Sequence, residues 1–369
     1  GGILADEILT PGRGQVRALF VTGGNPLITM PGSARLREAF SKLDLLVTLD
    51  IVKNETGSLA HYLLPATSPL ERPDLPFIFP LMLGLQAKPY LQATERVIRA
   101  DGEQRDEATI YLDLCRAAGV GLFGSKVAQK ALEGLKALHT RKHPGEQPAL
   151  PQEALLSLLL RLTGQGGFGA LLAAKHGRLR APHAGGDFLG KRVLTGDGKV
   201  QLAPPLLVAQ AQRQLEPAFA RELLDARRLK LITRRAVTTH NSWTHNLPAF
   251  VEGERGTNYL YMHPDDAARA GLASGDLADV TTDTATVRVP VRLLADLMPG
   301  TVALPHGWGH QHAKGLRVAS ATRGVNVNLL AADGPGRLEA VSGMAHLTGF
   351  IVDVKPADGP QAASWSGME

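Results

Sequence analysis

The sequence predicts an α/β fold in which a Rossmann-like parallel sheet comes first and a small β-barrel second. In the first third of the chain, short apolar strands alternate with segments of helical periodicity, which is typical of a parallel sheet. From residue 229 onward, β-rich segments follow one another with short turns, which favours a barrel. The chain has 369 residues, of which 44% are hydrophobic, so it can bury more than one core.

The first domain is expected at residues 1–125. Its elements alternate in type, with strands at 16–24 and 45–51 and helices at 31–44 and 107–119. Residues 61–71 are predicted to form a third strand that ends in a proline-rich loop. The last of these helices ends at Gly119, because glycine readily adopts the left-handed conformation that terminates a helix. Ligands of a parallel sheet bind at the carboxyl ends of its strands. We therefore expect a binding site where these strands end.

Residues 126–226 are expected to form a helical and irregular insert with a linker. Within it, residues 153–164 have apolar positions at helical spacing, and Gly164 ends that helix. The rest of the region mixes small and charged residues without a clear period, which indicates a long excursion over the surface. No motif in this region indicates a particular chemistry.

The barrel domain is expected at residues 227–355. Its strands are predicted at 229–235, 277–283, 285–293 and 300–308, with one helix at 263–271. Pro264 suits the first turn of that helix, and Asp265 and Asp266 favour the positive end of its dipole. The remaining residues, 356–369, are small and polar and are expected to form a flexible tail.

Composition restricts the partners and the compartment. The formal charge of +5 and the pI near 9.3 are mildly basic, but lysines and arginines are interspersed with acids. This favours an ordinary solvated surface over a nucleic-acid surface, and the same charge would suit a pocket for an anionic cofactor. No apolar run approaches the roughly 18 residues that a membrane span needs, so we expect no membrane span.

The one cysteine, Cys115, excludes a disulfide within the chain and an iron–sulfur cluster held by the chain's own thiolates. A reducing, cytoplasmic location is the default expectation for such a chain. Cys115 lies within a Leu-rich helical pattern, so we expect it in the core and not as a nucleophile. The chain begins with Gly1 and not with methionine, so it is either an internal fragment or a processed chain.

The stretch FVTGGNPLI, residues 20–28, is the first candidate binding loop. An apolar strand runs there into Gly23, Gly24, Asn25 and Pro26. Glycines let a ligand approach the backbone closely, and an asparagine offers both a donor and an acceptor. A plain turn is the alternative, because the stretch does not match the GxGxxG dinucleotide motif.

Asp50 is the second candidate, because it ends the next predicted strand. A carboxylate in that place can accept paired hydrogen bonds from guanine or from ribose hydroxyls. A strand-end carboxylate that caps a turn is the alternative.

Two other types of site are disfavoured. His306, His310 and His312 lie within seven residues, but no glutamate or cysteine completes a zinc spacing. Ser242 lies between His240 and His245, yet the GxSxG nucleophile elbow is missing. We therefore predict no metal ligand in this chain, and the catalytic residues stay unassigned.

Six segments in order resemble the carboxyl-terminal half of a molybdopterin oxidoreductase of the dimethyl sulfoxide reductase family: ALFVTGGNP, LLVTLDIVKNETGSLAHYLLPATSPLER, LITRR, HPDDAARAGLASGDLADVTT, PGTVALPHGWGH and GVNVNLL. The match covers residues 3–119 and 227–354, and the middle matches only loosely. The resemblance implies a six-stranded double-psi β-barrel-like second domain. It also implies two molybdopterin guanine dinucleotides around one molybdenum or tungsten atom.

The resemblance also assigns residues to the cofactor. Against one dinucleotide it places Gly23, Gly24, Asn25, Pro26 and Asp50, with Arg72 and Glu107 as weaker contacts. Glu55 and Thr56 resemble the family's TET segment, for which a purely structural role stays open. Against the second dinucleotide and the pterins it places Thr233, Arg234, His240, Asn241, Ser242, Trp243, His306, Trp308 and Asn328. For Arg234 the alternative is an ordinary surface arginine.

The family keeps its cysteine cluster and its metal-ligating residue in an amino-terminal half that this chain does not contain. The resemblance therefore implies a cofactor clamp that needs that half, fused upstream or as a partner chain, together with an electron-transfer partner and a small-molecule substrate. Any iron–sulfur cluster would lie in that half or in a partner. Two-electron redox chemistry of the formate dehydrogenase type is the implied reaction, although no residue selects formate.

Two alternatives from other classes stay open. The first is a non-catalytic scaffold, as in the large iron–sulfur subunit of respiratory complex I, which shares this type of fold. The polar residues Asn25, Asp50, Arg234 and Asn328 argue against it, because a scaffold does not need nucleotide contacts. The second is a nicotinamide-dependent dehydrogenase, which would need a glycine fingerprint that this chain lacks.

Overall fold

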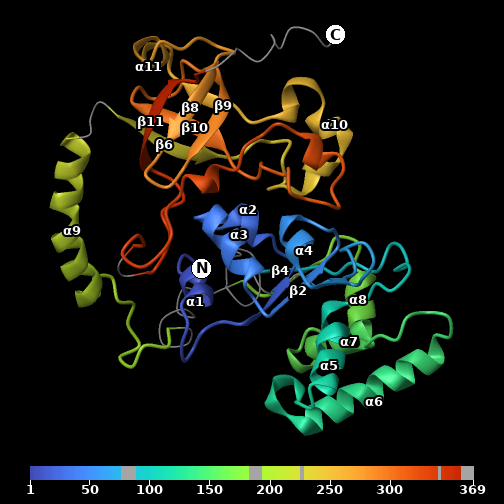
Figure 1. Cartoon of the computed structure of the whole chain (residues 1–369). Helices are drawn as coiled ribbons and strands as arrows, with labels where there is room; N and C mark the ends of the chain where they lie inside the picture. Colours follow the sequence, from blue (N-terminus) through green and yellow to red (C-terminus); the bar gives the residue numbers. More distant parts are fainter. Residues whose placement is uncertain (76–88, 183–192, 225–227, 340–341, 359–369) are drawn as a thin grey trace. The chain divides into compact units, whose positions relative to one another are not determined.

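The computed structural model describes residues 1–75, 89–182, 193–224, 228–339 and 342–358. The chain divides into two compact units. Unit 1 comprises Gly1–Thr48, Val52–Leu63 and Pro204–Glu369, and unit 2 comprises Leu49–Ile51 and Leu64–Ala203. Figure 1 shows the ribbon of the whole chain. This division reflects contacts in space, so it does not test the domain boundaries predicted near residues 125, 226 and 355. Those boundaries stay a prediction.

The predicted parallel sheet is confirmed. It consists of β1 (Ala18–Thr22), β2 (Leu45–Asp50) and β3 (Tyr62–Pro65), in the order β1-β2-β3. The third strand ends at Pro65, where the predicted proline-rich loop begins, because Pro65 lacks a backbone N–H group.

Four short helices of unit 1 accompany this sheet. They are α1 (Leu4–Leu9), α2 (Pro26–Thr29), α3 (Ser33–Ser41) and α4 (Glu55–Leu59). Leu36 and Phe40 on α3 are buried together with Leu46 on β2, as the helical spacing of the apolar residues predicts. Helix α4 begins at a cap: the Asn54 side chain accepts a hydrogen bond from the backbone N–H of Gly57 at 2.9 Å.

The predicted six-stranded barrel is also confirmed. Its strands are β6 (Leu229–Arg234), β7 (Leu260–Met262), β8 (Leu277–Thr281), β9 (Thr286–Leu293), β10 (Thr301–Pro305) and β11 (Phe350–Pro356). They close in the order β10-β6-β11-β8-β9-β7. Strand β10 runs parallel to β6, with Pro305 opposite Arg234. The loops that follow these two strands therefore leave the barrel side by side, at the same end.

The barrel core explains why the sequence pattern predicted strands. Along β8 the buried residues alternate with half-buried ones, and β9 begins with the same alternation. Leu231, Val289 and Val302 have no exposed surface, or almost none, inside the barrel. Strands β7 and β11 were not among the predicted segments.

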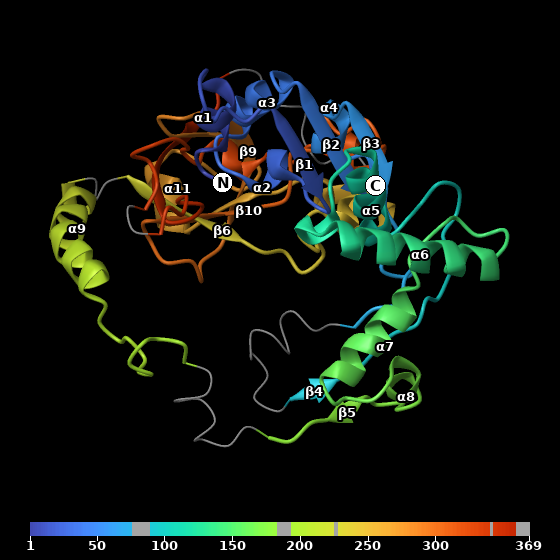
Figure 2. The same ribbon diagram turned by 90° about the horizontal axis from the view of Figure 1, so that it is seen from below.

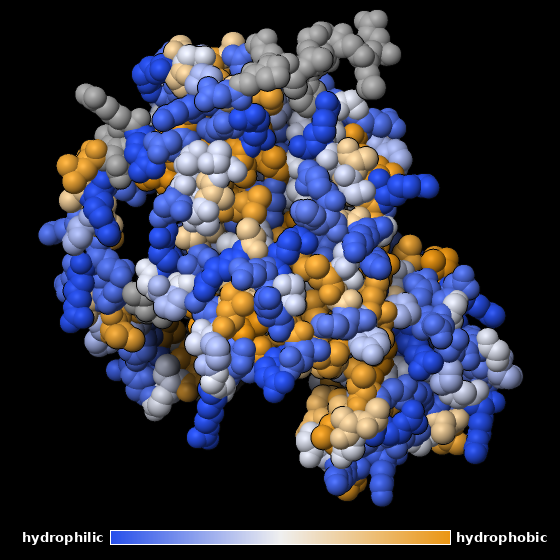
Figure 3. All heavy atoms as spheres, in the orientation of Figure 1, coloured by the Kyte–Doolittle hydropathy of each residue, from blue (hydrophilic) through white to orange (hydrophobic). Residues whose placement is uncertain are grey.

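Helix α11 (Pro264–Arg269) follows the prediction closely. Pro264 occupies its first turn, and the buried Asp266 accepts a hydrogen bond from the backbone N–H of Gly300 at 2.7 Å. The other helices of this part are α9 (Pro205–Leu224), α10 (Pro248–Val251), η4 (Trp243–Asn246), η5 (Gly253–Gly256), η6 (Ala319–Ala321) and η7 (Val327–Leu329). Figure 3 shows hydrophilic and hydrophobic residues interspersed on the visible face, as expected for the mixed charge pattern.

Unit 2 is mainly helical. Its elements are β4 (Tyr90–Leu91), β5 (Arg178–Leu179), α5 (Glu107–Ala117), η2 (Leu122–Gly124), α6 (Lys126–Lys142), α7 (Gln152–Leu162) and α8 (Phe168–Leu172). Figure 2 shows β4 and β5 next to α7 and α8, and Leu91, Leu160 and Phe168 form a common core there.

Three details of the sequence predictions can be compared with this unit and the tail. Helices α5 and α7 match the predicted segments, with Gly119 and Gly164 in the left-handed conformation after them. The expectation that Cys115 lies in the core was wrong, because its side chain on α5 is only half-buried. Most of the predicted tail, residues 359–369, lies outside the described residues. Within the described part of the chain, no helix is long and apolar enough to cross a membrane.

Candidate functional site

The loop after β1 leaves its backbone open. Gly23 has φ +57°, a left-handed conformation that favours glycine. A Cβ atom built on Gly23 would meet no atom within 4 Å, and one on Gly24 would meet only Val21 and Thr22 at 3.8 Å or more. The loop therefore offers two peptide groups that a ligand can approach closely.

Asn25 fixes this loop to the start of α4. Its Nδ2 donates to Glu55 Oε2 at 2.5 Å, and its Oδ1 accepts from the Thr56 hydroxyl at 2.9 Å. Both ends of the amide are thus bonded inside the protein. A role for the Asn25 side chain in binding a sugar or base, as predicted, would require it to share these bonds.

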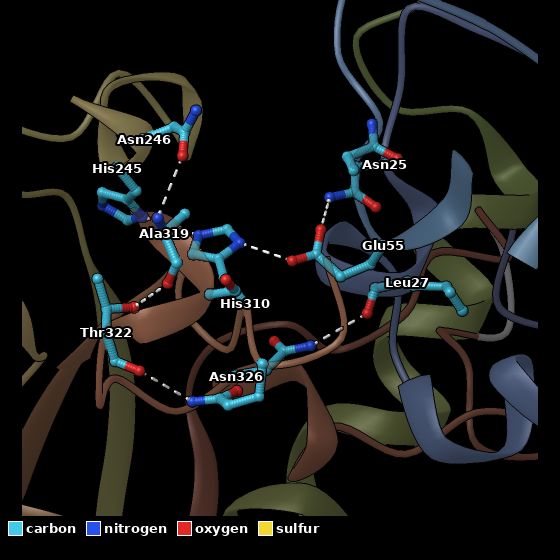
Figure 4. Close-up of polar contacts among 12 residues, drawn as sticks. Asn25, Leu27, Glu55, His245, Asn246, His310, Ala319, Thr322 and Asn326 are labelled. Atoms are coloured by element: carbon cyan, nitrogen blue, oxygen red, sulfur yellow. Dashed lines mark hydrogen bonds and ion pairs between the residues drawn. The ribbon is translucent and has the colours of Figure 1, made fainter. Parts of the chain in front are cut away.

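A buried chain of hydrogen bonds continues from Glu55 into the barrel domain (Figure 4). Glu55 Oε1 lies 2.7 Å from His310 Nδ1, and His310 Nε2 lies 2.9 Å from His245 Nδ1. None of the three side chains is more than 1% exposed. The set joins α4, the loop after β10 and the loop after β6 within unit 1.

The charge state of this buried set follows from its contacts. Burial alone would raise the pKa of Glu55, but the hydrogen bonds from His310 and Asn25 lower that pKa below its ordinary value. Burial, together with the neighbouring His310, lowers the pKa of His245 to about 4. At neutral pH, Glu55 is therefore a carboxylate and His245 is an uncharged imidazole.

Trp308 packs on the end of this chain. Its ring lies 4.0 Å from the His245 ring, centroid to centroid, with 31° between the planes. Trp308 is buried, as is His245, and Trp308 Nε1 and His245 Nε2 have no hydrogen-bond partner among the described residues. Buried polar atoms without partners are uncommon in proteins and indicate a place where a water or a ligand atom binds.

Glycines make this packing possible. Gly307 and Gly309 flank Trp308 with φ +89° and +100°. A side chain at Gly307 would overlap the carbonyl of Asn241, and one at Gly324 would overlap the Trp308 ring. The conformation of the Gly-Trp-Gly loop is therefore constrained by the close approach of neighbouring backbone atoms.

Two asparagines tie the late loop to α2. Asn326 Nδ2 donates to the carbonyl of Leu27 at 3.1 Å, and Asn328 Nδ2 donates to the carbonyl of Ile28 at 2.7 Å. Asn328, a predicted cofactor contact, is therefore buried and bonded to the protein. Asn326 has the same anchoring role and was not predicted.

The other predicted barrel residues form an edge whose side chains are half-buried or exposed. Arg234 lies over the Tyr261 ring at 4.4 Å, and the Asn241 Oδ1 accepts from Arg235 at 3.1 Å. His306 Nδ1 lies 3.2 Å from the carbonyl of Arg234. The members of this barrel edge, which we define as the predicted contacts of these two loops outside the buried chain, are Thr233, Arg234, His240, Asn241, Ser242, Trp243 and His306.

The barrel edge is held less firmly than the buried chain. Trp243 is 61% exposed, and its ring meets that of His240 edge to face at 5.9 Å. The Thr233 backbone N–H donates to the Thr348 hydroxyl at 3.1 Å. Asn241 has φ +55°, a conformation that asparagine tolerates better than most residues.

Three predicted residues belong to unit 2. Asp50 ends β2, and its Oδ1 accepts from the following backbone N–H at 2.7 Å, as in a strand-end cap. Arg72 and Glu107 form an ion pair at 2.5 Å. Both residues are predicted from the sequence as cofactor contacts, but the ion pair between them is not.

Histidines at 306, 310 and 312 do not gather. His310 is buried in the chain described above, whereas His312 is exposed. In the described part of the protein, no group of three or more His, Cys, Asp or Glu side chains could hold a metal ion.

A pocket of about 490 Å³ lies within unit 1. Its lining includes Arg37 on α3, Ser58 on α4, and Lys314 and Arg317 on the loop after β10. None of the described residues that line it carries a carboxylate. Its charge favours an anionic ligand.

The buried chain was only partly visible in the sequence. Glu55 lies in the TET-like segment and His310 in the histidine cluster, but the sequence predicts no partner for either. His245 is considered in the sequence only as part of a hydrolase site, which the missing GxSxG motif disfavours. Their sequence separations of 255 and 65 residues leave no local spacing that would reveal the contact.

Two family models match the chain. The molybdopterin oxidoreductase model matches residues 4–117. A model described as a molydopterin dinucleotide binding domain matches residues 229–346. Together they cover the sheet and the barrel except for β11 (Phe350–Pro356), and they leave residues 118–228 unmatched.

Curated relatives are similar at low identity. A trimethylamine-N-oxide reductase of Haemophilus influenzae is 22% identical over 327 residues, 82% of this chain and 38% of that protein. A formate dehydrogenase subunit alpha of Methanocaldococcus jannaschii is 22% identical over 307 residues, 82% of this chain and 40% of that protein. A probable oxidoreductase of Bacillus subtilis is 28% identical over 135 residues, 36% of this chain and 19% of that protein. The chain spans less than half the length of each of them.

A solved structure shows the same fold. Acetylene hydratase from Pelobacter acetylenicus matches with a TM-score of 0.70 and 20% identity, covering 96% of this chain and 46% of that chain.

Proposed function

Because the chain belongs to the molybdopterin oxidoreductases of the dimethyl sulfoxide reductase family, we propose that it forms the cofactor-binding part of a redox enzyme. This part would hold two molybdopterin guanine dinucleotides around one molybdenum or tungsten atom. The metal would supply two-electron redox chemistry. The chain itself would bind, orient and shield the cofactor.

The observation that carries this proposal is the open glycine backbone at the end of β1, held in place by a buried hydrogen-bond network. Gly23 and Gly24 leave room for a phosphate, a sugar or a base. Asn25 and Glu55 hold that loop from behind. An ordinary turn would not need such support.

Other features of unit 1 fit the same cofactor. Among the described residues, the buried His245 Nε2 and Trp308 Nε1 have no hydrogen-bond partner. A pterin edge carries both donors and acceptors that could bond to them. Arg37, Lys314 and Arg317 bring positive charge to the pocket, which suits the diphosphate of a dinucleotide.

We assign the predicted residues as follows. One dinucleotide would contact the backbone of Gly23 to Pro26, and the carboxylate of Asp50 at the end of β2 would also bind a dinucleotide. The second would contact the barrel edge, where Arg234 would neutralise phosphate charge. Asn328 would act by anchoring its loop to α2. Arg72 and Glu107 would act as the ion pair that they form.

The complete enzyme would contain further protein. An amino-terminal half, in the same chain or as a partner, would bring the metal ligand and an iron–sulfur centre, and an electron-transfer partner would exchange electrons with it. Formate is the substrate that we propose to test first. A cytoplasmic location stays a prediction.

One observation favours the scaffold alternative. The side chain of Asn25 is fully used inside the protein, and Asn328 donates its amide to the protein backbone, so neither residue is reserved for a nucleotide. The argument against a scaffold therefore depends on Asp50 and Arg234.

Composition of the natural assembly decides between these functions. The assembly would be purified and denatured, and molybdenum, tungsten, iron and the guanine nucleotide released by mild acid hydrolysis would be measured. We expect about two guanine nucleotides per metal atom. Absence of both metal and guanine nucleotide from a natively loaded sample would overturn the proposal in favour of the scaffold.

A matched pair of glycine variants tests the proposed contact. Gly23→Ala and Gly271→Ala both place a Cβ on a left-handed glycine that has no atom within 4 Å. Each costs about 1–2 kcal/mol of backbone strain. Only Gly23→Ala should lower the guanine nucleotide content of the purified protein. Equal content in the two variants would contradict a dinucleotide at this loop.

A further inference from the structure

The buried chain Glu55–His310–His245 contains three titratable side chains and ends at His245 Nε2, which has no hydrogen-bond partner among the described residues. Asn25 bonds to Glu55 at one end, and His245 Nε2 is the free end. A structural role requires only that every buried polar atom be satisfied. The free Nε2 is unexplained by such a role.

The hydrogen bonds fix which nitrogen carries each proton. The Glu55 carboxylate can only accept, so His310 Nδ1 donates to it. When His310 carries no proton at Nε2, that nitrogen accepts a hydrogen bond, and the donor must be His245 Nδ1. The uncharged His245 therefore presents a bare lone pair at Nε2. In this state the three side chains carry one net negative charge.

Addition of one proton at His245 Nε2 shifts the whole chain. The N–H bond of His245 Nδ1 breaks as a new N–H bond forms at His310 Nε2. His245 stays uncharged but now donates at Nε2, and His310 becomes an imidazolium beside the Glu55 carboxylate. The net charge changes from −1 to zero, and the reverse shift releases the proton at His245 Nε2.

The surroundings disfavour a positive charge on His245. His245 is penalised by burial and by the neighbouring His310 and His306, and it is favoured by Glu55 and by the carbonyl of Gly307. Arg37 also interacts electrostatically with Glu55. Glu55, hydrogen-bonded by His310 and Asn25, stays ionised and is the buried counter-charge for a positive His310.

We propose that Glu55, His310 and His245 form a proton relay that takes up and releases one proton at His245 Nε2, which changes this atom between hydrogen-bond acceptor and donor. The relay follows from the geometry of unit 1 alone. Its use as a proton source and sink for two-electron chemistry rests on the proposed function. The three residues are positioning and proton-holding residues.

Ring-nitrogen NMR of the native protein labelled with ¹⁵N-histidine tests the relay. Spectra would be recorded from pH 5 to 9, with His245→Asn and His310→Asn to assign the signals. At high pH we expect His245 to be protonated at Nδ1 and bare at Nε2. As the pH falls, His245 Nε2 should gain a proton at the same midpoint at which His310 becomes doubly protonated.

Variants of Glu55 provide a second test, because they should change the pH of the shared midpoint. Glu55→Gln removes the counter-charge, so the shared midpoint should fall by about one pH unit or more. Glu55→Asp keeps the charge and should restore part of the shift, whereas the exposed Glu38→Gln on α3 should leave the midpoint unchanged. Separate midpoints for the two rings, or an unprotonated His245 Nδ1 at high pH, would overturn the relay. Measuring metal and guanine nucleotide in the same sample separates this outcome from failure of the proposed function.

Discussion

The buried chain and the barrel edge lie on loops of the same unit but are built in opposite ways. In the buried chain, Glu55, His310 and His245 are at most 1% exposed and are joined by bonds of 2.7 and 2.9 Å. In the barrel edge, Trp243 is 61% exposed and Arg234 rests on a tyrosine ring. The difference indicates that the buried chain holds the loops in position. The barrel edge, by contrast, leaves side chains exposed to the ligand that we propose.

The largest expected effect comes from breaking the buried chain. His310→Leu leaves the Glu55 carboxylate buried with one partner fewer, which should cost about 3–5 kcal/mol in the free energy of unfolding. Urea unfolding of the native protein at pH 7 measures this cost. The control is His312→Leu, two residues away and exposed, which should change the stability by less than about 0.5 kcal/mol. Equal effects would show that His310 has no special structural role.

The second effect is a pH dependence of stability. The pKa of His245 is about 4 in the folded protein against an ordinary 6.5, so the unfolded chain binds more protons between these values. Stability therefore rises with pH across this window, by about 3 kcal/mol at most. The lowered pKa of Glu55 acts in the same direction at lower pH, because its contribution is lost as the pH falls. Unfolding at pH 4.5, 5.5 and 7 measures the slope.

His245→Asn should flatten that slope above pH 5, since the titrating group is gone. His346→Asn, a change of an exposed histidine in the barrel domain, is the control and should keep it. An unchanged slope in His245→Asn would mean that another group causes the pH dependence.

A smaller effect is expected for the loop anchor. Asn25→Ala removes hydrogen bonds to Glu55 and Thr56, which should cost about 1–3 kcal/mol. Because the loop loses its support, guanine nucleotide should also be lost during purification. Differential scanning calorimetry and nucleotide analysis measure the two results on one sample. A loss of stability with full nucleotide content would separate the anchor from the binding site.

The smallest effect on stability is expected at the barrel edge. Arg234→Ala removes a contact with the Tyr261 ring that is worth about 0.5–1 kcal/mol. The same change should lower the content of guanine nucleotide, because a charge that faces phosphate is removed. Arg288→Ala, on the exposed side of β9, is the control for loss of a surface arginine. Full nucleotide content in Arg234→Ala would end the assignment of a phosphate contact.

Local sequence patterns predicted most of the fold. The alternation of strand and helix led to β1, β2 and α3, and Pro264 with its acidic neighbours led to α11. The strands β7 and β11 were not predicted. Strand β7 has only three residues, which are too few for an alternating pattern, and β11 lies after a long irregular loop. The helices of the insert were predicted only in general terms.

The candidate site was predictable only where it follows strand ends. Gly23, Gly24 and Asp50 stand directly after or at the end of strands, so their place could be deduced. The partners of Asn25, Glu55 and His310 could not, because those contacts depend on how the barrel domain packs against α2 and α4 within unit 1. Side chains expected to face a ligand are in part used to hold these segments together.

The most direct test of the central claim is an experimental structure of the natural assembly with its cofactor. The account predicts one guanine dinucleotide within hydrogen-bonding distance of the Gly23 and Gly24 peptides and a second one against Arg234 and the rest of the barrel edge. The buried chain should keep its hydrogen bonds. A structure in which both places are filled by protein alone, with no dinucleotide, would contradict it.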